Sequence, residues 1–324
     1  MRVLGILVAA VLIGGACDAA RAACKINMLA ELPVHMVAGQ PRVTVIVNGH
    51  EAEAVVSTGA QQSMVRAWAA KRLEVFAFNV DAEMVMRGTT VPARGAELGT
   101  IQLGKLTLKR APIFVAGDDR RDRGEEDMVL GSNFFSEADL EFDLPHNTLR
   151  ILKPEGCKDD EVLYWGGAYS VVPSKSAAEG QHEPRLDVLI NGRKVEALLA
   201  SASFNSFISA STAQSVGSRP APGAKVEWDV LRRRPRTFDS VVIDQEALKN
   251  VTIDVVEIKQ VFDQSATGRR LAAQIRTDSM VLGADFLAAH RLLIANDQHR
   301  IYFTYEKGPA FQPSTPDDAG PTKE

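Results

Sequence analysis

Two short turns of this 324-residue sequence carry side chains whose type and position could do chemistry. The first turn reads Ser57-Thr58-Gly59 and the second reads Ala200-Ser201-Ala202. A serine hydroxyl such as that of Ser57 becomes a nucleophile when a neighbouring base takes its proton. No histidine lies beside Ser57 in the sequence, so a hydrolase of this kind would need the fold to bring a base to it.

The sequence lacks the patterns of several other reactive sites. It contains no HExxH or paired metal-ligand spacing and no G-x-S-x-G nucleophile elbow. Residues 99–106 (GTIQLGKL) approach a phosphate-binding loop, but Leu106 replaces the required Ser or Thr and a strand is expected to follow. The sequence therefore predicts no metal and no cofactor. The histidines, expected to be surface or hydrogen-bonded structural residues, are His35, His50, His146, His182, His290 and His299.

Both turns belong to an internal repeat. Residues 43–65 (VTVIVNGHEAEAVVSTGAQQSMV) align without a gap with residues 186–208 (LDVLINGRKVEALLASASFNSFI). In each copy an Asn-Gly pair, at 48–49 and at 191–192, separates two apolar segments. This pair predicts a two-residue hairpin turn, because Asn and Gly tolerate positive φ. Each of the two turns is therefore expected to follow the second strand of a hairpin.

A second matched pair lies downstream in each copy. Residues 128–135 (MVLGSNFF) correspond to residues 280–287 (MVLGADFL), and two strand-like segments follow each of them. The chain is thus expected to contain two mostly β halves, residues 23–173 and 186–306, each of ordinary domain size. The polar residues 174–185 are the expected linker, and residues 307–324, which contain several prolines, are an expected disordered tail.

These motifs resemble the pepsin and retropepsin group of aspartic peptidases, in particular the exported bacterial retropepsin-like proteins with two lobes in one chain. In that family each lobe contributes an apolar-apolar-Asp-Thr/Ser-Gly turn and a later apolar-apolar-Gly segment that packs beneath it. Here the second segment occurs twice, as Val129-Leu130-Gly131 and Val281-Leu282-Gly283. The resemblance covers residues 24–305. It implies a mostly β fold of two pseudo-two-fold-related pepsin/retropepsin-like β-barrel lobes with an interlobe cleft.

At the reactive positions the sequence departs from the family. Ser57 and Ala200 stand where the resemblance implies two catalytic aspartates. In aspartic peptidases such as pepsin, two carboxyls share one proton and activate water against the scissile carbonyl. A neutral hydroxyl and a methyl group cannot do this, and each positioned acid or base contributes roughly 10²–10⁴-fold to the rate. Ala202 replaces the glycine of the second turn, where a methyl could clash or exclude the required dihedrals.

The leading hypothesis is therefore a catalytically inactive, aspartic-peptidase-like protein that binds a peptide or protein in the interlobe cleft. The alternative is an active aspartic-type endopeptidase that takes its acids from elsewhere. Three aspartates could be considered, but each has a structural explanation. Asp285, with Asn133 as its counterpart, is expected to cap a helix, and Asp143 and Asp297 are expected to lie in turns.

Two segments are candidates for the covers of the cleft. Residues 232–236 (RRRPR) fall where the second lobe should carry a covering hairpin, and residues 84–90 are the corresponding segment of the first lobe. A solvated loop is the ordinary explanation of such a basic run. Both explanations of residues 232–236 stay open on the sequence alone.

Residues 1–22 have the parts of a secretory signal: Arg2, an apolar run over 3–13 and a small-x-small site at 20–22. Cleavage there leaves Cys24 and Cys157 in an oxidising compartment, where one disulfide between them is expected. Two free buried thiols are the alternative. The expected localisation is periplasmic or secreted. Lipid attachment at Cys17 ranks second, because Gly14 stands where such a site usually has leucine.

Composition restricts the partners further. The net charge is −4, so no electrostatic attraction to nucleic acid or to an anionic membrane is expected. Beyond the signal, no apolar segment approaches the roughly 18 residues of a membrane span. Because two lobes in one chain supply what single-lobe relatives obtain by dimerising, we expect a monomer.

Overall fold

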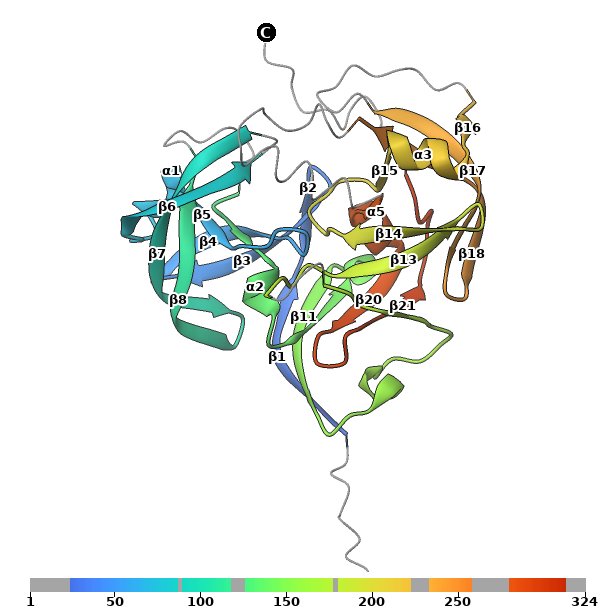
Figure 1. Cartoon of the computed structure of the whole chain (residues 1–324). Helices are drawn as coiled ribbons and strands as arrows, with labels where there is room; N and C mark the ends of the chain where they lie inside the picture. Colours follow the sequence, from blue (N-terminus) through green and yellow to red (C-terminus); the bar gives the residue numbers. More distant parts are fainter. Residues whose placement is uncertain are drawn as a thin grey trace, which may run out of the picture.

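The computed structural model describes residues 24–86, 89–117, 126–176, 180–222, 233–257 and 280–312. These residues form three sheets and a few short helices, so the expected mostly β fold is confirmed. Figure 1 shows one lobe on each side of the molecule and a third group of strands, including β1, β11, β20 and β21, below and between them. The chain therefore has the expected two-lobed architecture.

The first lobe is an eight-stranded sheet in the order β2-β3-β4-β9-β5-β8-β7-β6, in which β3 also pairs with β7. This extra pairing joins distant strands and curls the sheet toward a barrel. Buried and more exposed residues alternate along the second half of β3, because one face of the strand packs inward. The strands are β2 His35–Val37, β3 Gln40–Val47, β4 His50–Val56, β5 Met64–Arg66, β6 Ala77–Met86, β7 Thr89–Leu103, β8 Leu106–Ala116 and β9 Met128–Leu130.

The second lobe repeats this plan. Its seven-stranded sheet has the order β13-β14-β19-β15-β18-β17-β16, and β13 also pairs with β17. Strands β13, β14, β19, β15, β18 and β17 correspond in order to β3, β4, β9, β5, β8 and β7, so the internal repeat is also a structural repeat. The strands are β13 Arg185–Ile190, β14 Arg193–Leu199, β15 Phe207–Ser209, β16 Arg219–Pro220, β17 Arg234–Ile243, β18 Glu246–Val256 and β19 Met280–Leu282.

A six-stranded sheet joins the two lobes, in the order β1-β11-β10-β20-β21-β12. Strand β10 of the first half pairs with β20 of the second, with Phe142 opposite Leu292. The late strands of the two halves thus form one layer shared by both lobes. The strands are β1 Lys25–Pro33, β10 Asp139–Asp143, β11 Thr148–Glu155, β12 Ser170–Pro173, β20 His290–Ala295 and β21 Arg300–Tyr305.

The two predicted Asn-Gly hairpin turns are confirmed. Asn48 and Asn191 have φ of 50° and 49°, and the residues on either side of each turn pair with one another. Each asparagine side chain also donates to a carbonyl of its own lobe, Asn48 to Leu73 and Asn191 to Gly217. The helical segments are short: α1 Ala67–Ala70, α2 Ser132–Phe135, η1 Leu144–His146, η2 Asp159–Val162, α3 Ala210–Val216 and α5 Ala284–Ala289.

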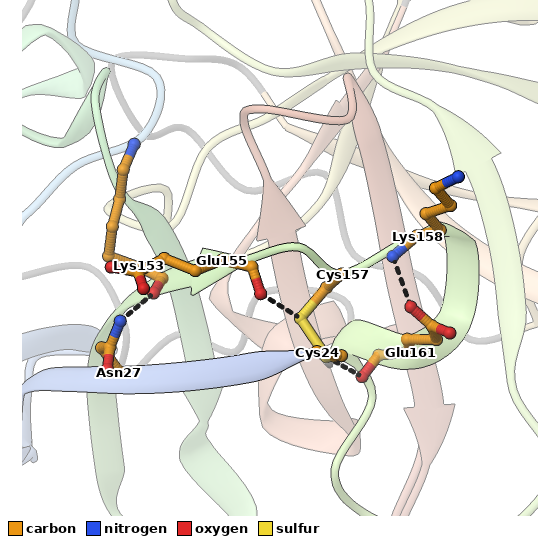
Figure 2. Close-up of a disulfide and its surroundings, with 7 residues drawn as sticks. All are labelled: Cys24, Asn27, Lys153, Glu155, Cys157, Lys158 and Glu161. Atoms are coloured by element: carbon orange, nitrogen blue, oxygen red, sulfur yellow. Dashed lines mark hydrogen bonds between the residues drawn. A yellow bond between two sulfur atoms is a disulfide. The ribbon is translucent and has the colours of Figure 1, made fainter. Parts of the chain in front are cut away.

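The disulfide between Cys24 and Cys157 is confirmed, with an S–S distance of 2.07 Å. Figure 2 shows it joining the start of β1 to the segment that follows β11. Beside it Lys25 pairs with Glu155, so the disulfide closes one end of the β1–β11 ladder. The alternative of two free thiols is therefore wrong.

Some sequence predictions fall outside the described residues. These are the signal over residues 1–22 with its Cys17, and most of the tail, residues 313–324. Within the expected linker, Lys175 and Arg185 form an isolated bridge. Among the described residues, no helix has the length and apolar character needed to cross a membrane.

Candidate functional site

Ser57 and Ala200 occupy equivalent places at the ends of two strands. Ser57 directly follows β4 and Ala200 directly follows β14, and each strand runs parallel to the apolar-apolar-Gly strand of its lobe, β9 or β19. Ser57 N donates to Leu130 O at 2.9 Å, and Ala200 N donates to Leu282 O at 2.9 Å. The same arrangement of strands therefore positions both residues.

Reciprocal hydrogen bonds hold the two turns together. Thr58 N donates to Ser201 Oγ at 3.0 Å, and Ser201 N donates to Thr58 Oγ1 at 3.0 Å. Each hydroxyl then donates to a carbonyl of the opposite lobe, Thr58 Oγ1 to Leu199 at 2.5 Å and Ser201 Oγ to Val56 at 2.7 Å. Thr58 is 2% exposed and Ser201 0%. The second residues of the two motifs thus form a buried polar joint between the lobes.

The two apolar-apolar-Gly segments lie directly against the turns, as the resemblance implied. A Cβ on Gly131 would lie 2.7 Å from the carbonyl carbon of Gln62 and 2.8 Å from Ala60 O. A Cβ on Gly283 would lie 2.5 Å from the carbonyl carbon of Asn205. Since these neighbours are backbone atoms that cannot swing away, both positions require glycine for a steric reason.

Neither Ser57 nor Ala200 supplies a carboxylate to the junction of the lobes. Ser57 is 7% exposed, and within the described ranges no side chain forms a hydrogen bond with its hydroxyl. The methyl of Ala200 faces the first lobe, because a Cβ built on Gly59 would lie 2.7 Å from it. The described residues therefore bring no base to Ser57, and the serine hydrolase hypothesis gains no support.

The expectation that Ala202 needs the dihedral freedom of glycine is wrong. Neither Gly59 nor Ala202 has a positive φ, so the backbone of these turns does not require glycine. Glycine is needed at 59 for a different reason, which is the close contact with Ala200. The carbonyl of Ala202 accepts a hydrogen bond from Gln40 Nε2 at 2.9 Å, a further contact between the lobes.

Asp285 is a structural carboxylate, but the predicted helix cap is wrong. The N-cap of α5 is Gly283, and Asp285 lies inside the first turn. Its Oδ1 accepts from Ser206 N at 2.8 Å and from Ser206 Oγ at 2.7 Å, and its Oδ2 accepts from Gln312 N at 3.1 Å. Burial raises the pKa of Asp285 to about 6, against the effect of these hydrogen bonds.

The first lobe repeats this contact with uncharged groups. Asn133 Oδ1 accepts from Ser63 Oγ at 2.9 Å, and Ser63 Oγ accepts from Gly131 N at 2.9 Å. In the second lobe Ser206 Oγ likewise accepts from Gly283 N at 2.9 Å. Asp285 and Asn133 therefore serve the same purpose, which is to hold the loop in front of β15 or β5.

Asp143 and Asp297 lie away from the two turns. Asp143 ends β10 and pairs with His146 at 2.6 Å and Arg150 at 3.2 Å. Asp297 lies in the turn between β20 and β21 and pairs with Lys153 at 3.2 Å. Both aspartates belong to the six-stranded sheet and its turns, so neither replaces a missing catalytic carboxylate.

The repeat extends three residues upstream of the segments aligned from the sequence. Gln40-Pro41-Arg42 precedes the first copy and Glu183-Pro184-Arg185 precedes the second. Both arginines are buried: Arg42 pairs with Glu53 at 2.7 Å, and Glu183 and Glu196 attract Arg185. The shared Pro-Arg pair is a signal that could have revealed these residues, which lie beside the two turns.

The segments that the sequence predicted as covers of an interlobe cleft are only partly described. Residues 84–86 and 89–90 end one strand and begin the next in the β6–β7 hairpin. Met84 and Val91 of this hairpin pack near Phe114 and Ala60, in a small apolar cluster. In the second lobe Arg232 lies outside the described residues. Arg234 and Arg236 lie on β17, and Arg236 donates to Ser218 O at 2.7 Å.

Two open hollows, of about 340 and 390 Å³, lie away from Ser57 and Ala200. Cys157, Lys158, Asp159, Gln298 and Arg300 line the first. His35, Thr44, Glu51, Ala52, Glu53, Arg72 and Asp127 line the second. Across the described ranges, no group of three His, Cys, Asp or Glu side chains is arranged to hold a metal ion.

Comparisons with known proteins agree with this architecture. Residues 43–137, in the first lobe, match the family model of the gag-polyprotein putative aspartyl protease. Among solved structures, the chain is similar to an aspartic proteinase from Irpex lacteus, with a TM-score of 0.52 and 10% sequence identity. That match covers 87% of this chain and 97% of the other. Comparison with curated protein sequences finds no match. The chain therefore has the two-lobed pepsin-like fold.

Proposed function

We propose that this protein is a catalytically inactive relative of the aspartic peptidases that binds a peptide or protein segment between its two lobes. The observation that carries this proposal is that the residues joining the lobes are intact, whereas the residues directly before them have no acidic group. Thr58 and Ser201 keep the interlobe joint, with hydrogen bonds of 3.0 Å in both directions. Ser57 and Ala200, one residue before each of them, provide no acid.

The substitutions are compatible with a binding protein. Two carboxyls held close together repel each other unless they share a proton, and burying them carries a desolvation cost. A hydroxyl and a methyl avoid both costs and leave the backbone of the turns in place. The lobes can then stay joined, with their facing surfaces available to a ligand, without any demand for catalysis.

The disulfide supports a location outside the cytosol. Disulfides such as Cys24–Cys157 form and persist in oxidising compartments. Together with the secretory signal expected over residues 1–22, this favours the periplasm or secretion. A monomer remains our proposal for the assembly, because both motif turns already come from one chain.

The first experiment compares cleavage by the wild type and by a restored variant. The purified protein and the triple variant Ser57→Asp, Ala200→Asp, Ala202→Gly are incubated with a broad peptide library from about pH 3 to 8, the range in which a carboxyl pair titrates. We expect no cleavage by the wild type and acid-dependent cleavage by the variant. The Ala202→Gly change restores the residue that the family has at this position of the second turn.

A second measurement tests binding directly. Labelled peptides from the same library are titrated against the wild type, and we expect some of them to bind without being cut. Cleavage by the wild type that a pepstatin-like inhibitor blocks would contradict the proposal and favour the active endopeptidase. A wild type that neither binds nor cleaves any peptide would contradict peptide binding.

A further inference from the structure

Glu183 lies beside the turn that contains Ala200. Leu199 N donates to Pro184 O at 2.9 Å, and Arg185 pairs with Leu198 in the β13–β14 ladder. One further step in this antiparallel register sets Glu183 opposite Ala200. Residues opposite each other in such a pair project from the same face of the sheet. Because the methyl of Ala200 faces the first lobe, this register predicts that the side chain of Glu183 projects toward that side as well.

The counterpart of Glu183 in the first lobe is Gln40, which has a partner. The pairing of Arg42 with Val55 sets Gln40 opposite Ser57 in the same way. Gln40 Nε2 donates across the lobes to Ala202 O at 2.9 Å. The side-chain amide of Gln40 therefore bridges the two lobes by donating a hydrogen bond.

A carboxylate at the equivalent position cannot donate such a bond. Glu183 is 8% exposed, and its Oε2 has no hydrogen-bond partner within the described part of the chain. Gln181 Oε1, two residues earlier, is also buried and has no partner there. A buried acceptor without a donor has lost its water and gained nothing in return, so it calls for an explanation.

The carboxylate oxygen of Glu183 that lacks a donor favours a cationic ligand. Arg185 is buried, and Glu183 and Glu196 both attract its guanidinium. Glu196 also attracts the ammonium of Lys194, whereas Glu183 keeps one oxygen that no donor in the described part of the chain reaches. An ammonium or a guanidinium would bring a positive charge and several N–H donors to this carboxylate oxygen.

We propose that Glu183 Oε2 binds a cationic nitrogen of the ligand beside the Ala200 turn. The ligand is then a polypeptide with a lysine or arginine side chain at this position. This inference rests on the proposed function, since it names the class of peptide that the site between the lobes takes. Ser57 and Ala200 contribute no competing charge.

The test uses pools of short randomised peptides that differ in one fixed central residue: Arg, Lys, Ala or Glu. Binding to the full-length protein is measured by fluorescence anisotropy. We expect the Arg and Lys pools to bind about tenfold or more tightly than the Ala pool, as a hydrogen bond to a charged group allows. Glu183→Gln is expected to remove this preference. Glu196→Gln, which takes a charge from the other side of Arg185, is the matched control and is expected to keep it.

A measurement on the wild type covers the case in which Glu183→Gln does not fold. Replacing arginine by citrulline in the pool keeps the shape of the side chain and removes its charge. We expect this replacement to weaken binding by the same factor of about ten. Equal binding of all pools, or a preference for basic peptides that survives in folded Glu183→Gln, would overturn this inference and leave the proposed function standing. Absence of binding by every pool contradicts the proposed function and this inference with it.

Discussion

Thr58 and Ser201 come from opposite lobes and exchange N–H···Oγ hydrogen bonds of equal length, 3.0 Å in each direction. This exchange involves the residue directly after Ser57 and the residue directly after Ala200. The joint between the lobes and the reactive positions thus use neighbouring residues of the same turns. Because the joint needs only hydroxyls and backbone groups, it persists when the reactive positions carry no acid.

The first prediction concerns this joint. Ser201→Ala removes the acceptor of Thr58 N and the donor to Val56 O, both buried. We expect the free energy of unfolding to fall by roughly 2–4 kcal/mol, measured by denaturant titration. Combined with Thr58→Val, the loss should be smaller than the sum of the single losses, because the two side chains share one network. Ser215→Ala, at an exposed serine, is the control; strictly additive losses would refute the coupling.

The second prediction concerns the glycine beneath the first turn. Gly131→Ala would put a methyl 2.7 Å from a backbone carbon of Gln62, so we expect the unfolding free energy to fall by at least about 2 kcal/mol. Gly166→Ala is the matched control, because nothing lies within 4 Å of its added methyl and its φ is not positive. Equal thermal unfolding midpoints for the two variants would contradict the steric argument.

Local signals explain why much of the fold was predictable. The Asn-Gly pairs at 48–49 and 191–192 fix two-residue turns by their backbone preferences, and the repeat locates Ser57 and Ala200 at the ends of equivalent strands. The sharing of one six-stranded sheet by both halves depends on long-range pairing of β10 with β20. No local pattern encodes that pairing.

The candidate site was predictable in position but not in its contacts. The serine and threonine of the two turns were identified, yet their exchange of hydrogen bonds depends on how two lobes meet. The local sequence predicts a helix cap at Asp285, because the hydroxyl that donates to its carboxylate, on Ser206, lies far away in the sequence. The sequence does not single out Glu183, because what makes it a candidate is a buried carboxylate oxygen without a donor, and only three-dimensional packing reveals that oxygen.

The third prediction concerns the disulfide. It closes a loop between residues 133 positions apart, and a loop of this length restricts the unfolded chain by about 5 kcal/mol in the chain-entropy description. We expect Cys24→Ser, Cys157→Ser to lower the unfolding free energy by about 2–5 kcal/mol. Reductant should lower the denaturation midpoint of the wild type to that of the variant and leave the variant unchanged. A reductant-insensitive wild type would disprove the stabilising role.

The last prediction concerns pH. Burial raises the pKa of Asp139 and of Asp285 from 3.8 to about 6. Between these values the folded protein holds protons that the unfolded chain has released, so stability rises as the pH falls from about 6 toward 4. A shift of about two units corresponds to roughly 3 kcal/mol per group. This contribution is lost as the pH rises through 6.

A carboxylate whose pKa is lowered in the folded protein has the opposite effect on stability, because the protein loses stability when that carboxylate is protonated at low pH. Burial raises the pKa of Glu53, but hydrogen bonds from His35 and Arg42 outweigh it, so the pKa is lowered overall. Its stabilising contribution disappears as the pH falls through that lowered value. The stability of the protein should therefore pass through a maximum in mildly acidic solution, between about pH 4 and 6.

Asp139→Asn tests whether the buried carboxylate of Asp139 causes the gain in stability on acidification. Asp139 Oδ1 accepts from Asn296 N at 2.8 Å, and Oδ2 has no hydrogen-bond partner among the described residues, so asparagine keeps the acceptor and removes the buried charge. The variant should be more stable than the wild type at pH 7 and should gain less stability between about pH 7 and 5. Asp239→Asn, at a side chain 75% exposed, should follow the wild-type profile apart from a small constant offset. If Asp139→Asn gained as much stability on acidification as the wild type, the buried carboxylate would not be the group that titrates.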